Sequence, residues 1–204
     1  MGVLKDAFAR LNTKRNHFKL NIVKNCNDAN SVIDSLKTID LALINVNIPP
    51  SENDNPIFIE DVGVKLRFTF PKVKIILFSS YKNNIYINSL LKILNPDCLL
   101  VKSDINFNEL LNAIETVTTE APYYSKTVIR YMRQRIVSKI IIDQTDKAIL
   151  YYLSKGIKIK DLPRFINLSK SAIELRKRKL KDVFEVEDQG DYHLLQQASE
   201  QGFI

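Results

Sequence analysis

The stretch from Ile142 to Phe184 carries the pattern that most restricts the fold of this chain. Apolar residues recur at helical spacing over Thr145–Lys155, and Gly156 follows where a helix commonly ends. A short second helix, Lys158–Ile166, leads through a tight turn into a third helix over Ser169–Phe184. Helix, glycine stop, short helix, turn and helix is the order of a helix-turn-helix unit.

The third of these helices is strongly basic. Ser169 can cap it, because a serine hydroxyl accepts from a free N–H group of the first helical turn. One stripe of the helix is apolar and the other faces carry mostly lysine and arginine, which suits a groove lined by phosphates, although a solvated basic helix shows the same pattern. The residues predicted to contact DNA are Lys170, Ser171, Arg176, Lys177, Arg178 and Lys179, with Lys155, Lys158 and Lys160 as additional phosphate contacts.

The charge of the chain is concentrated in the same half. Residues 1–120 hold 14 basic and 13 acidic residues, residues 121–184 hold 16 and 5, and residues 185–204 hold none and 5. The cationic excess therefore lies in the second half of the chain, where the helix-turn-helix is found. This asymmetry favours an anionic partner, and the helix pattern fits DNA better than a membrane surface.

Residues 1–120 alternate short apolar segments with amphipathic ones, which predicts an α/β domain with a parallel sheet. The predicted strands are Phe18–Val23, Leu41–Val46, Val73–Phe78 and Cys98–Val101. The predicted helices are Gly2–Leu11, Asn27–Ser35, Ile57–Thr69, Asn84–Leu94 and Phe107–Thr118. Pro122 marks the domain boundary, and Ser125–Ile142 is predicted to be a helical connector.

Residues 142–184 resemble, without a gap, the LuxR-type helix-turn-helix that ends NarL/FixJ-like response regulators. The positions that match the acidic, apolar, glycine or capping residues of that family are Asp146, Ile149, Leu150, Leu153, Gly156, Ile159, Lys160, Asp161, Leu162, Ile166, Leu168, Ser169, Ile173, Leu180 and Phe184. Two features depart from the family. Pro163 lies inside the second helix, and Ser171-Ala172-Ile173-Glu174 replaces the frequent Lys-Thr-Val-Lys. A glutamate would be repelled by phosphates but can accept from the amino group of cytosine.

The first half resembles a response-regulator receiver domain. Asp40–Pro49 resembles the strand that ends in the phosphoacceptor aspartate, Ile75–Ser80 places Ser79 at the conserved Thr/Ser, and Leu99–Ser103 places Lys102 at the conserved lysine. The resemblance implies a flavodoxin-like, doubly wound parallel sheet, followed by an all-α helix-turn-helix domain. The implied boundaries are 1–121 for the receiver-like domain, 122–141 for a helical linker and 142–204 for the DNA-binding domain. The insertion Pro50–Asn55 and the segment Gln201–Ile204 resemble response regulators of Bacteroidetes-type bacteria.

The receiver-like site departs from the family pattern at the positions that accept the phosphoryl group and bind Mg²⁺. The phosphoacceptor position is Asn45, and a neutral amide cannot form an aspartyl phosphate. The first strand, which normally ends in the acidic pair that binds Mg²⁺, is missing from the sequence. An upstream start codon, trimming, or a strand borrowed from another chain would each account for it. Ser79 and Lys102 are then interpreted as a hydrogen-bonded strand end and a surface lysine, and no metal or other cofactor is expected.

The sequence therefore predicts a DNA-binding transcriptional regulator whose receiver-like domain acts by dimerisation or by sensing a regulatory protein or small molecule. In the family, the face formed by the segments equivalent to Asn84–Leu94, Cys98–Val101 and Phe107–Thr118 often forms a homodimer. The alternative is a protein-interaction adaptor that has lost DNA binding, which Glu174 and the acidic segment Glu185–Asp191 would permit. An enzyme is disfavoured, since the sequence has no glycine-rich phosphate loop, metal-ligand cluster or Ser-His-Asp set.

The remaining sequence features concern the compartment. No apolar run approaches the roughly 18 residues that span a bilayer, and no signal peptide opens the sequence. Cys26 and Cys98 are the only cysteines, and they are expected to be reduced and buried. A cytoplasmic protein is predicted.

Overall fold

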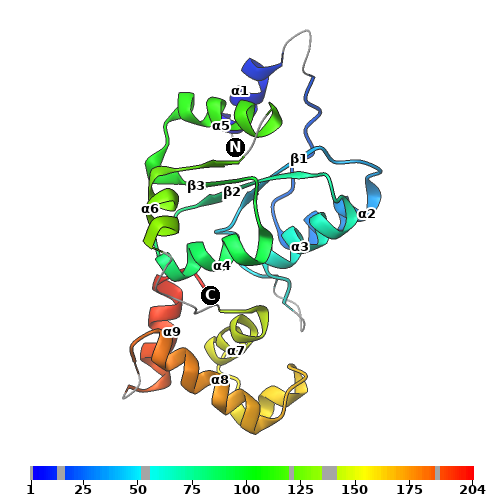
Figure 1. The fold of residues 1–204 in the computed structure, drawn as a ribbon. Helices are drawn as coiled ribbons and strands as arrows, with labels where there is room; N and C mark the ends of the chain where they lie inside the picture. The colour runs from blue at the N-terminus through cyan, green and yellow to red at the C-terminus, as the bar shows by residue number, and fades with distance from the viewer. Residues whose placement is uncertain (1, 13–16, 52–55, 120–121, 135–141, 187–188) are drawn as a thin grey trace.

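The computed structural model describes residues 2–12, 17–51, 56–119, 122–134, 142–186 and 189–204 (Figure 1). It contains a sheet domain, residues 2–134, and a helical domain, residues 142–204. The sheet domain comprises α1 (Gly2–Leu11), α2 (Cys26–Ser35), β1 (Leu41–Asn45), α3 (Ile59–Thr69), β2 (Lys74–Ser79), α4 (Asn84–Leu94), β3 (Cys98–Val101), the 3₁₀ helix η1 (Lys102–Asp104), α5 (Phe107–Thr119), β4 (Tyr123–Tyr124) and α6 (Lys126–Gln134). The helical domain comprises α7 (Gln144–Ser154), the 3₁₀ helix η2 (Ile159–Arg164), α8 (Lys170–Val183) and α9 (Asp191–Glu200).

The sheet has the order β1-β2-β3-β4, and every neighbouring pair is parallel, as the sequence predicted. Asn45 lies opposite Phe78, and Ser79 lies opposite Val101. Because parallel strands end at the same edge of a sheet, the residues that end β1, β2 and β3 are brought together. The fold class predicted from the sequence is confirmed: a parallel sheet covered by helices, followed by a helical part.

Helices cover both faces of the sheet. Ile75 and Leu77 of β2 pack with α2, α3 and α4, whereas Ile76 and Phe78 pack with α1 and α5. Figure 1 shows these two helical layers on opposite sides of the strands. A strand buried on both faces has no polar side, which explains the continuous apolar run in the sequence of β2.

The predicted strand Phe18–Val23 is not formed. These residues have no partner in the sheet, and Leu20 and Ile22 are 41% and 47% exposed. Phe18 instead packs against Phe8 of α1, with their ring centroids 5.0 Å apart. Alternation of polar and apolar residues is compatible with a strand but does not select a partner. Among the described residues β1 is the edge strand of the sheet, and Phe18–Val23 does not pair with its open edge.

Helices α3 and α4 pack closely at Gly63. A Cβ atom on Gly63 would lie 2.7 Å from Cδ2 of Leu94, so a larger residue there would require the Leu94 side chain to move. Helix α4 has no fully exposed residue, because α6 packs against it and against β3. The dimer face that the family resemblance implied is therefore covered in part by α6 of the same chain.

Two aspartates fix the start of the strands and the start of α6. Asp97 accepts hydrogen bonds from the backbone N–H of Ile75 (3.0 Å) and from Arg67 (2.7 Å) and Lys74 (3.1 Å). Burial alone would raise the pKa of Asp97, but these donors hold it below its ordinary value. Asp104 accepts from the backbone and hydroxyl of Thr127 at the start of α6. The connector is thus helical from Lys126 to Gln134, and residues 135–141 of the prediction lie outside the described residues.

Candidate nucleic-acid interface

Helix α7 forms the base of the helix-turn-helix unit. Asp143 caps it by accepting from the N–H of Asp146 (2.9 Å), and the Asp146 side chain accepts in return from the N–H of Asp143 (3.2 Å). Ile149 and Leu150 are fully buried. Gly156 ends the helix at φ +81, a backbone conformation that side chains with a Cβ rarely adopt. These features confirm the first helix and its stop.

The second element of the unit is a 3₁₀ helix, Ile159–Arg164, which is shorter than the helix predicted over Lys158–Ile166. Pro163 lies inside it and has no backbone N–H to donate in the i→i−4 hydrogen bonds that an α-helix requires. Leu162 is fully buried and anchors the element against the rest of the unit. The order of elements is unchanged, but the connection to α8 begins earlier than predicted, because η2 ends at Arg164 and α8 begins at Lys170.

Helix α8 presents one buried and one open face. The Ser169 hydroxyl accepts from the N–H of Ala172 at 3.3 Å, as predicted for an N-cap. Ile173 and Leu180 point inward and are buried. The residues exposed on the outer side are Ser171, Glu174, Leu175, Arg178, Lys179 and Asp182. Figure 1 shows α7 between the sheet domain and α8, so this outer side faces away from the sheet.

Two cations predicted to contact DNA are engaged within the domain. Nη1 of Arg176 lies 2.8 Å from a carboxylate oxygen of Asp143 and 2.8 Å from one of Asp146, so α8 is tied to the start of α7. The hydrogen bonds that Arg176 donates to both carboxylates raise its pKa, and burial raises the pKa of Asp146. Lys177 donates to both oxygens of Asp191 at 2.8 Å, so α8 is also tied to α9.

The other predicted contacts have different surroundings. Arg178 and Lys179 are exposed and form no ion pair with another described residue. Lys170 is exposed and lies 3.6 Å from Glu174 one turn away. Lys155 lies over the ring of Tyr151 at 5.4 Å, and Lys158 and Lys160 are exposed on the loop and on η2. Sequence reasoning missed Leu175, which is 52% exposed in the middle of the outer face. Its position between the charged residues of the helix was the available signal.

The three receiver-type residues do meet at the carboxyl edge of the sheet, but they satisfy one another or their neighbours. Nζ of Lys102 donates to Oδ1 of Asn45 at 2.9 Å. The Ser79 hydroxyl is fully buried and hydrogen bonds with the backbone N–H (3.0 Å) and carbonyl (3.2 Å) of Tyr81. Among the described residues, no group of three or more His, Cys, Asp and Glu side chains is placed to hold a metal ion.

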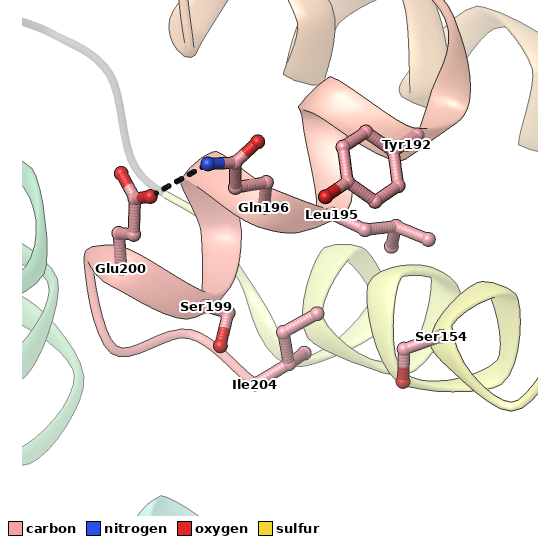
Figure 2. A pocket seen from close by; sticks show the side chains of 7 residues that line it. All are labelled: Ser154, Tyr192, Leu195, Gln196, Ser199, Glu200 and Ile204. Carbon is pink, nitrogen blue, oxygen red and sulfur yellow. Dashed lines mark hydrogen bonds between the residues drawn. The ribbon is translucent and has the colours of Figure 1, made fainter.

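A groove of about 450 Å³ lies between α9 and the end of α7. Figure 2 shows its lining, with Leu195 and Ile204 beside Ser154 and the ring of Tyr192 at one side. The only charged residue among its lining side chains is Glu200, which accepts from Gln196 at 3.0 Å. These groups provide no acid–base pair, and we assign no chemistry to the groove.

No helix in the described part of the chain is long and apolar enough to cross a membrane.

The sequence matches no protein-family model and no curated protein, but solved structures share its fold. RcsB from Salmonella enterica serovar Typhimurium bound to promoter rprA aligns with a TM-score of 0.64 and 13% identity, over 96% of this chain and 91% of that one. The RcsB response regulator of Salmonella typhimurium, from a study of conformational dynamism for DNA interaction, gives 0.61 and 15% over 98% and 92%. RcsB bound to promoter P1flhDC gives 0.56 and 13% over 98% and 92%. The shared fold is a receiver-type α/β domain followed by a helix-turn-helix domain.

Proposed function

We propose that this chain is a DNA-binding transcriptional regulator of the response-regulator type, a binding protein and not an enzyme. The observation that carries the proposal is the outer face of α8, where Arg178 and Lys179 extend from a helix whose other side is fixed by buried apolar residues and internal ion pairs. A rigid helix that presents unpaired cations on one side suits the major groove of DNA. The shared fold supports the proposal, since the RcsB structures are described as bound to promoters.

We assign different roles to the predicted DNA contacts. Arg178 and Lys179 reach phosphates or guanine edges of the DNA. Ser171 and Lys170, at the start of α8, contact the DNA backbone. Leu175 lies against base edges, where an apolar side chain can contact the methyl group of thymine. Lys155, Lys158 and Lys160 provide further phosphate contacts. Arg176 and Lys177 act indirectly, because their ion pairs set the position of α8.

The proposed receiver-like domain does not signal through an aspartyl phosphate. Asn45 offers a neutral amide that already accepts from Lys102, and the Ser79 hydroxyl is engaged by Tyr81. We propose that the domain acts through a partner, a small molecule or a second copy of the chain. A homodimer would place two copies of α8 on two half-sites. Such a regulator would act in the cytoplasm.

The test is fluorescence anisotropy of a mixed-sequence DNA duplex titrated with the protein at several salt concentrations. The double variant Arg178→Ala/Lys179→Ala should bind more weakly, and its slope of log K against log salt should be shallower by about 2, since each phosphate contact contributes roughly 0.9. The matched control is Lys37→Ala/Lys72→Ala, which removes the same charge from exposed positions of the sheet domain.

Equal salt slopes in the two variants would contradict the proposal that the outer face of α8 binds DNA. Absence of salt-dependent binding by the unmodified chain would instead favour the protein-interaction adaptor. The acidic Glu174 and Asp182 and the apolar Leu175 on the outer face would then belong to a protein-binding surface.

A further inference from the structure

A buried ion pair joins the two domains. Glu60 in the first turn of α3 and Lys147 in the first turn of α7 form a salt bridge, and each residue is only 2% exposed. The ammonium group of Lys147 also lies over the rings of Tyr86 (5.1 Å) and Phe203 (5.7 Å). A buried lysine needs a partner of opposite charge, because an unpaired buried charge is strongly unfavourable. Lys147 finds that partner only when the helical domain rests on the sheet domain.

The segment that follows α9 packs beside this ion pair and contacts both domains. The ring of Phe203 packs edge-on against Tyr86 of the sheet domain (5.2 Å) and against Phe184 of the helical domain (5.5 Å). Asn83 of the sheet domain donates to the side-chain oxygen of Gln201 at 2.9 Å. One short segment, Gln201–Ile204, thus contacts both domains at once, and Ile204 continues into the groove seen in Figure 2.

Gly202 is required for this arrangement. Its φ is +87, and a Cβ atom at this position would lie 2.3 Å from Cδ2 of the Tyr81 ring. Gly156 has a similar φ of +81, yet a Cβ atom there would meet nothing within 4 Å. The two glycines therefore share a positive φ, but only Gly202 lies against an aromatic ring. Gly156→Ala is thus a control for the backbone strain that Gly202→Ala introduces.

The same contact reaches the carboxyl edge of the sheet. The Tyr86 hydroxyl donates to the carbonyl of Val46 at 3.2 Å and lies 3.5 Å from Oε1 of Glu60. Val46 directly follows Asn45. Tyr81, which packs on Gly202 and edge-on against Tyr86 at 5.5 Å, hydrogen bonds with Ser79. The residues at the receiver-type position are thus one hydrogen bond away from the side chains that hold the helical domain.

We propose that Gln201–Ile204 and the Glu60–Lys147 pair form a clasp that holds the helical domain on the sheet domain with the outer face of α8 uncovered. The clasp sets the relative position of the domains without a phosphoryl group. Displacing Phe203 from between Tyr86 and Phe184 frees the helical domain to move relative to the sheet domain. This inference does not rest on DNA binding, because the distance between the domains can be measured in the free protein.

The test is the interdomain distance distribution, measured by pulsed electron spin resonance. Spin labels are placed on the full chain at Lys72→Cys in the sheet domain and Arg164→Cys in the helical domain, both exposed positions. Cys26 and Cys98 are buried, and burial raises the pKa of their thiols to about 11 and about 12, so they should not compete for the label. The unmodified clasp should give one narrow distribution. Gly202→Ala should broaden it and shift it to longer distances, whereas Gly156→Ala should leave it narrow.

The ion pair is tested with a second set of variants, which decides the question even if Gly202→Ala does not fold. Glu60→Met leaves Lys147 without its counter-ion and should broaden the distribution as Gly202→Ala does. Glu60→Met/Lys147→Met removes both charges and should restore a narrow distribution, because two apolar side chains can pack where the pair lay. A wild-type distribution in Gly202→Ala or Glu60→Met would overturn the clasp. So would a distribution in Gly156→Ala as broad as that of Gly202→Ala, or a double variant as broad as Glu60→Met.

Discussion

The carboxyl edge of the sheet and the outer face of α8 both carry residues that the sequence resemblance links to ligand binding, yet they differ in what those residues are free to do. At the sheet edge, Lys102 donates to Asn45 and Ser79 hydrogen bonds with Tyr81, so the polar groups satisfy one another. On α8, Arg176 and Lys177 are engaged in ion pairs, whereas Arg178 and Lys179 are exposed and form no ion pair with another described residue. Residue type and spacing thus predict a site less well than the partners that surround each group.

The inner and outer faces of α8 should respond differently to substitution, which Ile173 and Leu175 test because they lie only two positions apart. Ile173→Ala should lower the free energy of unfolding by about 2–5 kcal/mol, because it leaves a cavity at a fully buried position. Leu175→Ala should change it by less than about 0.5 kcal/mol, since that side chain is half exposed, but should weaken DNA binding. Urea unfolding followed by circular dichroism measures the first effect, and anisotropy measures the second. Comparable destabilisation by both variants would contradict the assignment of the two faces.

The amino ends of the strands carry a charged counterpart to Asn45: the Asp97 carboxylate accepts from Arg67, Lys74 and the backbone N–H of Ile75. Asp97→Asn should lower the free energy of unfolding at pH 7 by about 2 kcal/mol, because charge-assisted hydrogen bonds from Arg67 and Lys74 are lost. The pKa of Asp97 is lowered in the folded protein, so its stabilisation is present above the unfolded pKa near 3.9 and is lost as the pH falls through the folded value.

Urea unfolding at a series of pH values from 7 to 3 measures this acid loss, which should be smaller in Asp97→Asn. The control is Asp6→Asn, which removes an exposed carboxylate of α1 and should leave the acid loss unchanged. An identical pH dependence of unfolding in the Asp97 variant and the unmodified chain would refute the role of Asp97.

Arg176 tests whether a cation of α8 acts on DNA or on the fold. Arg176→Ala should lower the free energy of unfolding by about 1–2 kcal/mol, a modest value because the side chain is one-third exposed and solvent screens its pairs with Asp143 and Asp146. Its DNA affinity should fall while the salt slope stays close to that of the unmodified chain. A slope reduced as much as in an Arg178→Ala variant would instead make Arg176 a direct phosphate contact.

The smallest effect is expected at the sheet edge. Acetyl phosphate with Mg²⁺ should add no acid-labile phosphoryl group to the chain. Asn45→Asp should not restore this reaction, because no cluster of carboxylates that could hold the metal lies among the described residues. The variant should change the free energy of unfolding by less than about 0.5 kcal/mol. Intact-mass spectrometry before and after acid treatment detects the phosphoryl group. Its appearance on an alternative aspartate of the unmodified chain would show that the site retains its chemistry.

Local signals in the sequence predicted most of the fold. The buried runs at Leu41, Val73 and Cys98 form the predicted parallel strands, and Ser169 and Gly156 cap and end the predicted helices. The predicted strand at Phe18–Val23 is not formed, because alternation of polar and apolar residues does not by itself provide a pairing partner. The internal pairing of Arg176 and Lys177 could not be foreseen either, since Asp143, Asp146 and Asp191 approach α8 only through tertiary packing. The buried contact of Glu60 with Lys147 joins residues 87 positions apart and has no local signature.

The position of β1 in the sheet has a practical consequence. Its residues, Leu41–Asn45, carry no charge, and no described strand pairs with their outer edge. An uncharged extended edge with free N–H and C=O groups recruits extended segments of other molecules, and natural proteins usually protect such edges with lysine or proline. We therefore expect the protein to aggregate at high concentration, even well below its unfolding temperature, through contacts at the open edge of β1.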